Sequence, residues 1–107
     1  MTQNNLADVG LVGLAVMGQN LVMNMADKGY KVAVFNRTYE KVTLFLENEA
    51  ASYKNIIGAN SIKNLVDSLS LPRKIILLVK AGDAVDDFIK QIVPFLSKGD
   101  IIIGSFC

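Results

Sequence analysis

An apolar segment that runs directly into a glycine-bounded turn constrains this chain more than any other feature. Residues 7–12 are mostly apolar, and the hexapeptide from Gly13 to Gly18 follows at once, with Ala15 as its third residue. Residues 16–28 then carry apolar side chains at the spacing of an amphipathic helix. A strand, a tight turn and a helix in this order predict the first half of a βαβ unit.

The same alternation continues along the chain. Further short, β-branched runs predict strands over residues 31–35, 56–57, 74–79 and 100–103. Thr38 and Ser61 stand where they can cap the second and third helices, and a fourth helix is expected over residues 84–96, with Pro94 distorting its last turn. The fold class is therefore α/β, a doubly wound and mainly parallel sheet forming one domain over residues 1–107.

Composition excludes several classes of protein. The chain of 107 residues is 51% hydrophobic and 20% charged, as expected for one folded core. Eleven basic and ten acidic residues give a net charge of +1, so neither a nucleic-acid surface nor a membrane surface is indicated. With no apolar run long enough for a bilayer and no signal peptide, we expect a cytoplasmic protein. The chain lacks histidine and its single cysteine is Cys107, so we assign no metal site and no catalytic residue within it.

The glycine turn has the pattern G-x-A-x-x-G of a Rossmann-like dinucleotide site. Gly13 allows a tight turn, a small residue at position 15 lets a pyrophosphate approach the backbone, and Gly18 lets the helix pack on the strand. The positive end of the helix then faces the phosphates. Ala15 departs from the general pattern by one methyl group. The alternative is a turn with a purely structural role.

The end of the second predicted strand points to the type of dinucleotide. An acidic residue that binds the ribose of NAD is expected about 20 residues after the glycine turn, and here the chain reads Asn36-Arg37-Thr38. Arg37 offers a planar cation for adenine and a 2′-phosphate, with Asn36 and Thr38 as hydrogen-bond partners. This pattern favours NADP over NAD. In the alternative, Arg37 is a solvated surface residue and Thr38 only a cap.

For two further residues, Lys80 and Met17, the sequence allows either a role in cofactor binding or a purely structural one. Lys80 follows the fourth predicted strand, at the edge of the sheet where ligands bind in open α/β folds, and it is expected either to contact a cofactor phosphate or ribose or to be an exposed lysine in a turn. Met17 either flanks a nicotinamide ring or fills core.

Several of these motifs together resemble the 6-phosphogluconate dehydrogenase family. The motifs are GLAVMGQNL, NRT, PRK, LLVKAG and GDIII, at residues 13–21, 36–38, 72–74, 77–82 and 99–103. The resemblance covers residues 7–103. Related β-hydroxyacid dehydrogenases usually carry glycine at the position of Ala15, so the Ala-Val-Met form followed by Gln-Asn-Leu favours the phosphogluconate enzyme.

The resemblance implies oxidative decarboxylation of 6-phosphogluconate to ribulose 5-phosphate and CO2 with reduction of NADP, in the pentose phosphate pathway. It also implies three sets of cofactor-binding residues. The pyrophosphate and nicotinamide set is Gly13, Leu14, Ala15, Val16, Met17 and Gly18; the 2′-phosphate set is Asn36, Arg37 and Thr38; the third set is Val79, Lys80 and Ala81.

The end of the chain departs from the family. After Ile103 the family continues with Asp-Gly-Gly-Asn-Ser, a loop that contacts cofactor and substrate, whereas this chain reads Gly-Ser-Phe-Cys. The family's large helical domain, with its catalytic lysine and glutamate and most of its dimer interface, is also absent. We therefore expect a sheet that is incomplete at its carboxyl-terminal side and exposes the fifth strand to self-association. Dehydrogenase activity, 6-phosphogluconate binding and the homodimer are expected of the full-length enzyme alone. An alternative end, a frameshift or a cloned boundary would each explain this departure.

Three other assignments remain open. A non-catalytic NADP-binding module and another β-hydroxyacid dehydrogenase would need the same crevice. A signalling domain of the response-regulator type shares the architecture but needs acidic residues at the strand ends to bind Mg²⁺. The first predicted strand ends in Val12-Gly13, which disfavours that class.

Overall fold

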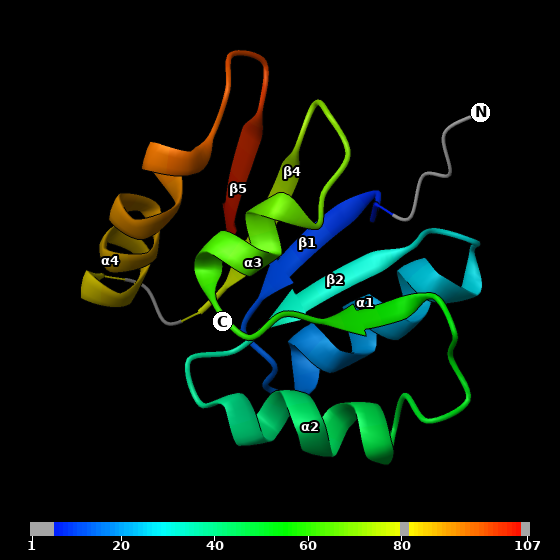
Figure 1. Ribbon diagram of the computed structural model, residues 1–107. Coiled ribbons are helices and arrows are strands. Elements are labelled where there is room, and N and C mark those ends of the chain that lie inside the picture. Colours follow the sequence, from blue (N-terminus) through cyan, green and yellow to red (C-terminus); the bar gives the residue numbers. More distant parts are fainter. Residues whose placement is uncertain (1–5, 80–81, 106–107) are drawn as a thin grey trace, which may run out of the picture.

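The computed structural model describes residues 6–79 and 82–105 and shows one five-stranded parallel sheet with helices on both faces (Figure 1). The strands are β1 (Val9–Val12), β2 (Val32–Phe35), β3 (Ile56–Gly58), β4 (Lys74–Leu78) and β5 (Ile101–Ser105). The helices are α1 (Val16–Asp27), α2 (Tyr39–Glu47), α3 (Ile62–Asp67) and α4 (Asp83–Ile92). None of the helices within the described residues has both the length and the apolar character that spanning a membrane demands.

The strand order is β3-β2-β1-β4-β5, which confirms the predicted doubly wound, Rossmann-like arrangement. The chain winds from β1 toward β3 and then returns to add β4 and β5 on the other side of β1. The order therefore reverses between β1 and β4, whose carboxyl ends lie side by side. In open α/β sheets, ligands bind in the crevice at this point.

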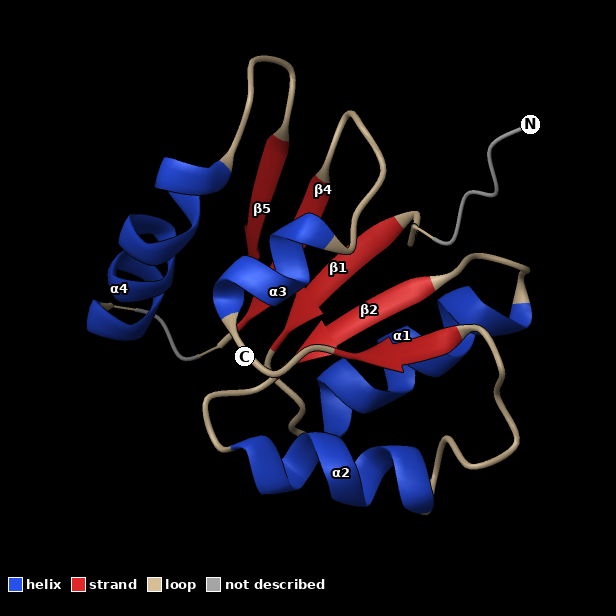
Figure 2. Cartoon of the chain, in the orientation of Figure 1, coloured by secondary structure: helices blue, strands red, loops and turns tan. Residues whose placement is uncertain are grey.

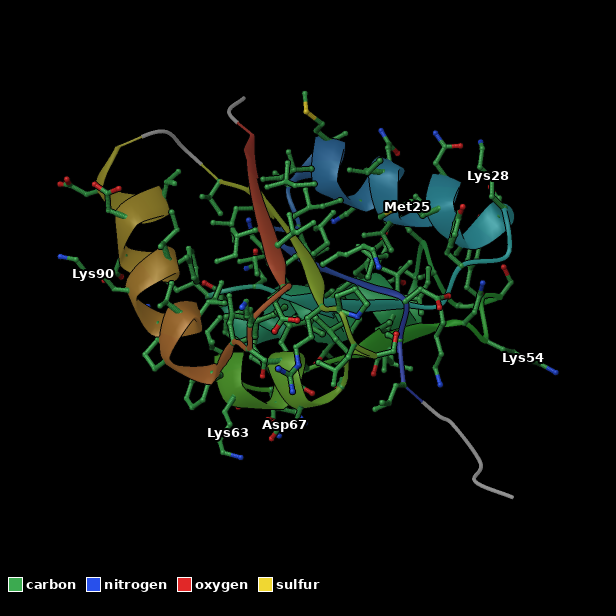
Figure 3. The ribbon with its side chains drawn as sticks, turned by 90° about the horizontal axis from the view of Figure 1, so that it is seen from above. Met25, Lys28, Lys54, Lys63, Asp67 and Lys90 are labelled. Carbon is green, nitrogen blue, oxygen red and sulfur yellow. The ribbon has the colours of Figure 1, made fainter. Side chains whose placement is uncertain are left out.

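Two apolar layers, one on each face of the sheet, hold the helices in place. On one face, Val22 of α1 and Phe45 of α2 are fully buried against Leu11 and Val34. On the other face, Leu65 of α3, together with Phe88 and Ile92 of α4, packs against residues of β1, β2 and β4. Figures 2 and 3 show α1 and α3 on opposite sides of the strands. Strands buried on both faces explain the continuous apolar runs in the sequence.

The sequence predicts side-chain caps at two helix starts, and the structure shows only one of them. Ser61 caps α3, because its hydroxyl accepts a hydrogen bond from the Asn64 N–H at 3.0 Å. Thr38 occupies the corresponding position before α2, but its side chain makes no capping hydrogen bond. The backbone carbonyl of Thr38 makes the local contacts instead, accepting from the Lys41 N–H at 3.0 Å and from the Asn36 side chain at 3.1 Å. The predicted Thr38 side-chain cap is therefore wrong.

The last predicted helix is divided, and the predicted distortion at Pro94 is confirmed. Helix α4 ends at Ile92, and a 3₁₀ turn, Val93–Phe95, continues the chain toward β5. Proline has no N–H to donate and clashes with the preceding turn, so an α-helix does not continue through it. The predicted inward residues of this helix include Val85, Phe88 and Ile92, and all three are buried.

Candidate functional site

The turn between β1 and α1 requires glycine at both of its ends. Gly13 has a φ of 110°, in the region that side chains avoid, and a Cβ there would overlap the carbonyl oxygen of Leu78 in β4. A Cβ on Gly18 would overlap the carbonyl oxygen of Gly13. The structure thus confirms the tight turn at Gly13 and the close helix packing at Gly18. Ala15 precedes α1 and is exposed, so its methyl group is accommodated at the mouth of the turn.

The amino end of α1 is suited to an anion. Its first turn contains no acidic residue, and no side chain caps it. The first N–H groups of an α-helix have no intrahelical acceptor, and the helix dipole places partial positive charge there. Val16, the first residue of the helix, is 73% exposed. This helix end therefore offers backbone donors and positive potential to a phosphate group.

Asn36 connects the two loops that border the crevice. Its side-chain oxygen accepts a hydrogen bond from the Leu14 N–H at 2.9 Å, and its amide nitrogen donates to the Thr38 carbonyl at 3.1 Å. Gln19 supports the same turn by donating to the Leu14 carbonyl at 3.1 Å. The amide of Asn36 thus fixes the β1–α1 turn relative to the start of α2.

Arg37 is held by α4, a helix 50 residues further along the chain. Its guanidinium carbon lies 5.2 Å from the centroid of the Phe88 ring, within the range of a cation–π contact. Phe88 in turn meets Phe35 edge to face, with ring centroids 6.4 Å apart. Nη2 of Arg37 lies 3.3 Å from Oδ2 of Asp87. Arg37 therefore lies at the surface with its side chain 64% exposed and has two partners on α4, Phe88 and Asp87.

These elements border an open cavity of about 380 Å³ at the carboxyl ends of β1, β2 and β4. Its lining residues are Val12, Gly13, Leu14, Ala15, Asn36, Arg37, Lys41, Leu78, Val79, Ala84 and Phe88. The cavity has a cationic edge formed by Arg37 and Lys41 and a largely apolar floor. A planar apolar group with attached phosphates has the chemistry that this combination favours.

The predicted site residues divide into three sets. Six of the twelve line the cavity, namely Gly13, Leu14, Ala15, Asn36, Arg37 and Val79. Val16 and Met17 lie in the exposed first turn of α1, Gly18 is buried under it, and Thr38 is exposed before α2. Met17 is 53% exposed, so the alternative that it fills core is wrong. Lys80 and Ala81 lie outside the described residues.

The sequence analysis did not identify five of the lining residues, namely Val12, Lys41, Leu78, Ala84 and Phe88, nor Asp87, which pairs with Arg37. Lys41 lies in the first turn of α2, four positions after Arg37, and this closeness in sequence was the available signal. Phe88 was expected to face inward, and it does, but its contact with Arg37 depends on long-range packing. Asp87 adjoins Phe88 on the exposed side of α4, where nothing in the pattern marks it. Across residues 6–79 and 82–105, no three His, Cys, Asp or Glu side chains are grouped to hold a metal ion.

A family model described as the NAD binding domain of 6-phosphogluconate dehydrogenase matches residues 8–105. The decarboxylating 6-phosphogluconate dehydrogenase of Ceratitis capitata is 65% identical over 97 residues, which make up 91% of this chain and 20% of that enzyme. The enzyme of the same name from Candida albicans is 65% identical over 96 residues, covering 90% of this chain and 18% of that enzyme. The chain spans about a fifth of the length of these curated relatives.

Solved structures of similar proteins agree with the sequence matches. Plasmodium falciparum 6-phosphogluconate dehydrogenase, determined in its apo form, with NADP+ and with 6-phosphogluconate, matches with a TM-score of 0.83 and 45% identity over 92% of this chain and 21% of that chain. An imine reductase from Myxococcus stipitatus in complex with NADP+ matches with a TM-score of 0.73 at 21% identity, over 92% of this chain and 32% of that chain. The second likeness shows the shared fold alone.

Proposed function

This chain belongs to the family of NAD-binding domains of 6-phosphogluconate dehydrogenase, and from this premise we propose that it is a domain that binds NADP in the cavity at the carboxyl ends of β1, β2 and β4. One observation carries the proposal most directly. Arg37 lies over Phe88 at the rim of the cavity, and the acid-free start of α1 opens at the same end of the sheet. A cation for one phosphate and a helix end for another are what a phosphorylated dinucleotide requires.

The turn from Gly13 to Gly18 would hold the pyrophosphate. Gly13 and Gly18 let the chain pack closely in this turn, since a Cβ on either would overlap a carbonyl oxygen, and the first turn of α1 presents its N–H groups without a competing carboxylate. Val16 and Met17, exposed in that first turn, would face the nicotinamide end of the cofactor. Val79 would border the cofactor from the end of β4, and family resemblance assigns Lys80 and Ala81 to the same loop.

Arg37 would bind the 2′-phosphate and cover the adenine. The exposed hydroxyl of Thr38 makes no capping bond and is therefore available as a second donor. Lys41 adds a second cation at the cavity. Asn36 would act mainly by positioning, since its amide already bonds both loops. No acidic residue stands where NAD-specific folds bind the ribose hydroxyl, so this edge favours NADP.

The complete protein would be an NADP-dependent, decarboxylating 6-phosphogluconate dehydrogenase that is cytoplasmic and homodimeric. Bound NADP supplies the hydride acceptor for that reaction. Residues 1–107 would form its cofactor-binding domain, and groups that contact 6-phosphogluconate would come from other parts of the enzyme. We therefore expect this chain alone to bind NADP without oxidising 6-phosphogluconate, which an assay of NADPH formation, followed by the absorbance of the reduced nicotinamide, will check.

The direct test is a calorimetric titration of the chain with NADP and, separately, with NAD. We expect saturable binding that favours NADP, and we expect Arg37→Ala to weaken NADP binding by about 10- to 100-fold while changing NAD binding much less, since a hydrogen-bonded charge contributes about 1.5–3 kcal/mol. The matched control is Lys63→Ala, which removes an exposed, ion-paired cation on the outer side of α3 (Figure 3). Equal binding of both nucleotides, unaffected by Arg37→Ala, would contradict the proposal.

A further inference from the structure

The carboxylate of Asp87 already occupies one edge of the guanidinium proposed to bind the 2′-phosphate. Nη2 of Arg37 and Oδ2 of Asp87 are 3.3 Å apart, and Gln91, one turn further along α4, donates to the same oxygen at 3.4 Å. The Arg37 and Asp87 side chains are 64% and 58% exposed, so water can replace either partner. The ion pair is thus a contact that an incoming anion can compete for.

The surroundings of this pair are unusually acidic. A second cavity of about 400 Å³ adjoins the first, and Arg37 lines both. The residues around this second cavity are Arg37, Asp83, Ala84, Asp86, Asp87 and Lys90. Three carboxylates therefore face two cations, whereas the cavity proposed for NADP has Arg37 and Lys41 and no carboxylate in its lining. Of the three acids, Asp87 alone forms a salt bridge with Arg37 among the described residues.

We propose that Asp87 is a specificity-determining residue that competes with the 2′-phosphate for Arg37 and so lowers the preference for NADP over NAD. This inference rests on the proposed function. The guanidinium carbon of Arg37 lies 5.2 Å from the centroid of the Phe88 ring, so Arg37 has a second partner on α4 that does not depend on the charge of Asp87. Asp87 is therefore not required to position Arg37, and its main effect on a bound 2′-phosphate is repulsion. NAD carries no 2′-phosphate and does not experience this competition.

The expected size of the effect follows from charge and exposure. A carboxylate close to a phosphate dianion at a solvent-exposed site changes affinity by about three- to tenfold. Salt screens such an effect, with a Debye length near 10 Å at 0.1 M and about 3 Å at 1 M. Asp87→Asn is therefore expected to bind NADP about three- to tenfold more tightly at low salt, with most of the gain lost at high salt.

The experiment measures NADP and NAD affinities of the 107-residue chain and of Asp87→Asn by calorimetry, at low and high salt. The matched control is Asp67→Asn, which removes one exposed, ion-paired carboxylate on α3 (Figure 3) that lines neither cavity. A second variant, Arg37→Ala combined with Asp87→Asn, tests the coupling, because the gain should vanish once Arg37 is absent. Melting curves followed by circular dichroism confirm that each variant is folded.

Tighter NADP binding in Asp87→Asn, with unchanged NAD binding and no gain in Asp67→Asn, supports the inference. Unchanged or weaker NADP binding would overturn it and would assign Asp87 to positioning or to no role. An equal gain for both nucleotides, or the same gain in Asp67→Asn, would overturn it in favour of a general charge effect. If the unsubstituted chain binds neither nucleotide, the proposed function itself fails and the inference fails with it. Preference for NADP without the Asp87→Asn gain leaves the proposed function intact and removes only the inference.

Discussion

Helices α1 and α4 begin at the same end of the sheet, α1 directly after β1 and α4 shortly after β4, yet they present opposite surfaces to a phosphate. The first turn of α1 contains no acidic residue, whereas that of α4 contains Asp83 and Asp86. Acids at a helix start stabilise the helix by occupying the positive end of its dipole. Helix α1 lacks this stabilisation because its first turn has no acidic residue, and its positive end therefore stays available to an anion. The parallel topology supplies several helix ends at one edge of the sheet, and the placement of carboxylates decides which of them can bind phosphate.

The largest expected loss of nucleotide affinity comes from Gly13→Ala, which destroys the turn before α1. A methyl group there overlaps the Leu78 carbonyl and requires a positive φ, so we expect a loss of about 2–5 kcal/mol in the free energy of unfolding and no measurable NADP binding. Urea unfolding and calorimetry measure the two effects. Gly29→Ala is the control, since Gly29 also has a positive φ but open space around it. That variant should lose only about 1–2 kcal/mol and should still bind. Equal losses in both variants would show that the close contact with β4 is unimportant.

A smaller but more diagnostic effect is expected from Val16→Asp, which gives α1 the acidic start of α4. Because Val16 is 73% exposed, little packing is lost, and the carboxylate should stabilise the helix by about 0.3–1 kcal/mol. The same carboxylate should weaken NADP binding by at least about tenfold through repulsion of the pyrophosphate. Val16→Asn, which has nearly the same shape without the charge, separates sterics from electrostatics. If Val16→Asp binds NADP as tightly as Val16→Asn, the acid-free helix start is not what admits the phosphate.

The smallest effect on affinity is expected from Asp100→Asn, at the opposite end of the sheet. Asp100 accepts hydrogen bonds at 2.7 Å from the backbone N–H groups of Ser97 and Arg73, and its side chain is 1% exposed. The Ser97 N–H is the main cause that lowers the pKa of this carboxyl from its ordinary value of 3.8, with further lowering by Arg73. The variant should be less stable at neutral pH but should bind NADP within about twofold of the original affinity, because distant sites act independently.

The lowered pKa of Asp100 also fixes the direction of a pH dependence. A carboxyl with a depressed folded-state pKa contributes its full stability above the unfolded value of 3.8, and the contribution is lost as the pH falls through the folded value. The difference in urea midpoint between the original chain and Asp100→Asn should therefore be smaller at pH 3 than at pH 7. A difference that is unchanged at pH 3 would contradict this assignment.

Local patterns in the sequence were sufficient for the parallel α/β sheet, because apolar runs and helical spacing are properties of neighbouring residues. The predicted ends of the strands were less accurate. Ala7 makes only an isolated bridge to Leu69, so β1 starts at Val9 rather than at residue 7. Strand β5 extends to Ser105 because it pairs with β4 as far as Leu78. Both differences depend on partners far away in the sequence.

The candidate site shows the same limit. Gly13 and Gly18 could be predicted from the sequence, since the turn that requires them is formed by neighbouring residues. Arg37 was identified by its place after a strand, but its partners Asp87 and Phe88 lie some 50 positions away. No spacing rule connects a strand end with the side of a later helix, and only the packing of α4 against the sheet brings them together.

The most direct test of the central claim, that NADP binds at the carboxyl ends of β1, β2 and β4, is a titration of the ¹⁵N-labelled chain with NADP followed by its backbone amide NMR signals. We expect the largest shifts at Gly13, Ala15 and Arg37, with the amides of Gly29 and Arg73 at the amino ends of the strands unchanged. Shifts centred on Gly29 and Arg73, or spread evenly over the chain, would contradict the account.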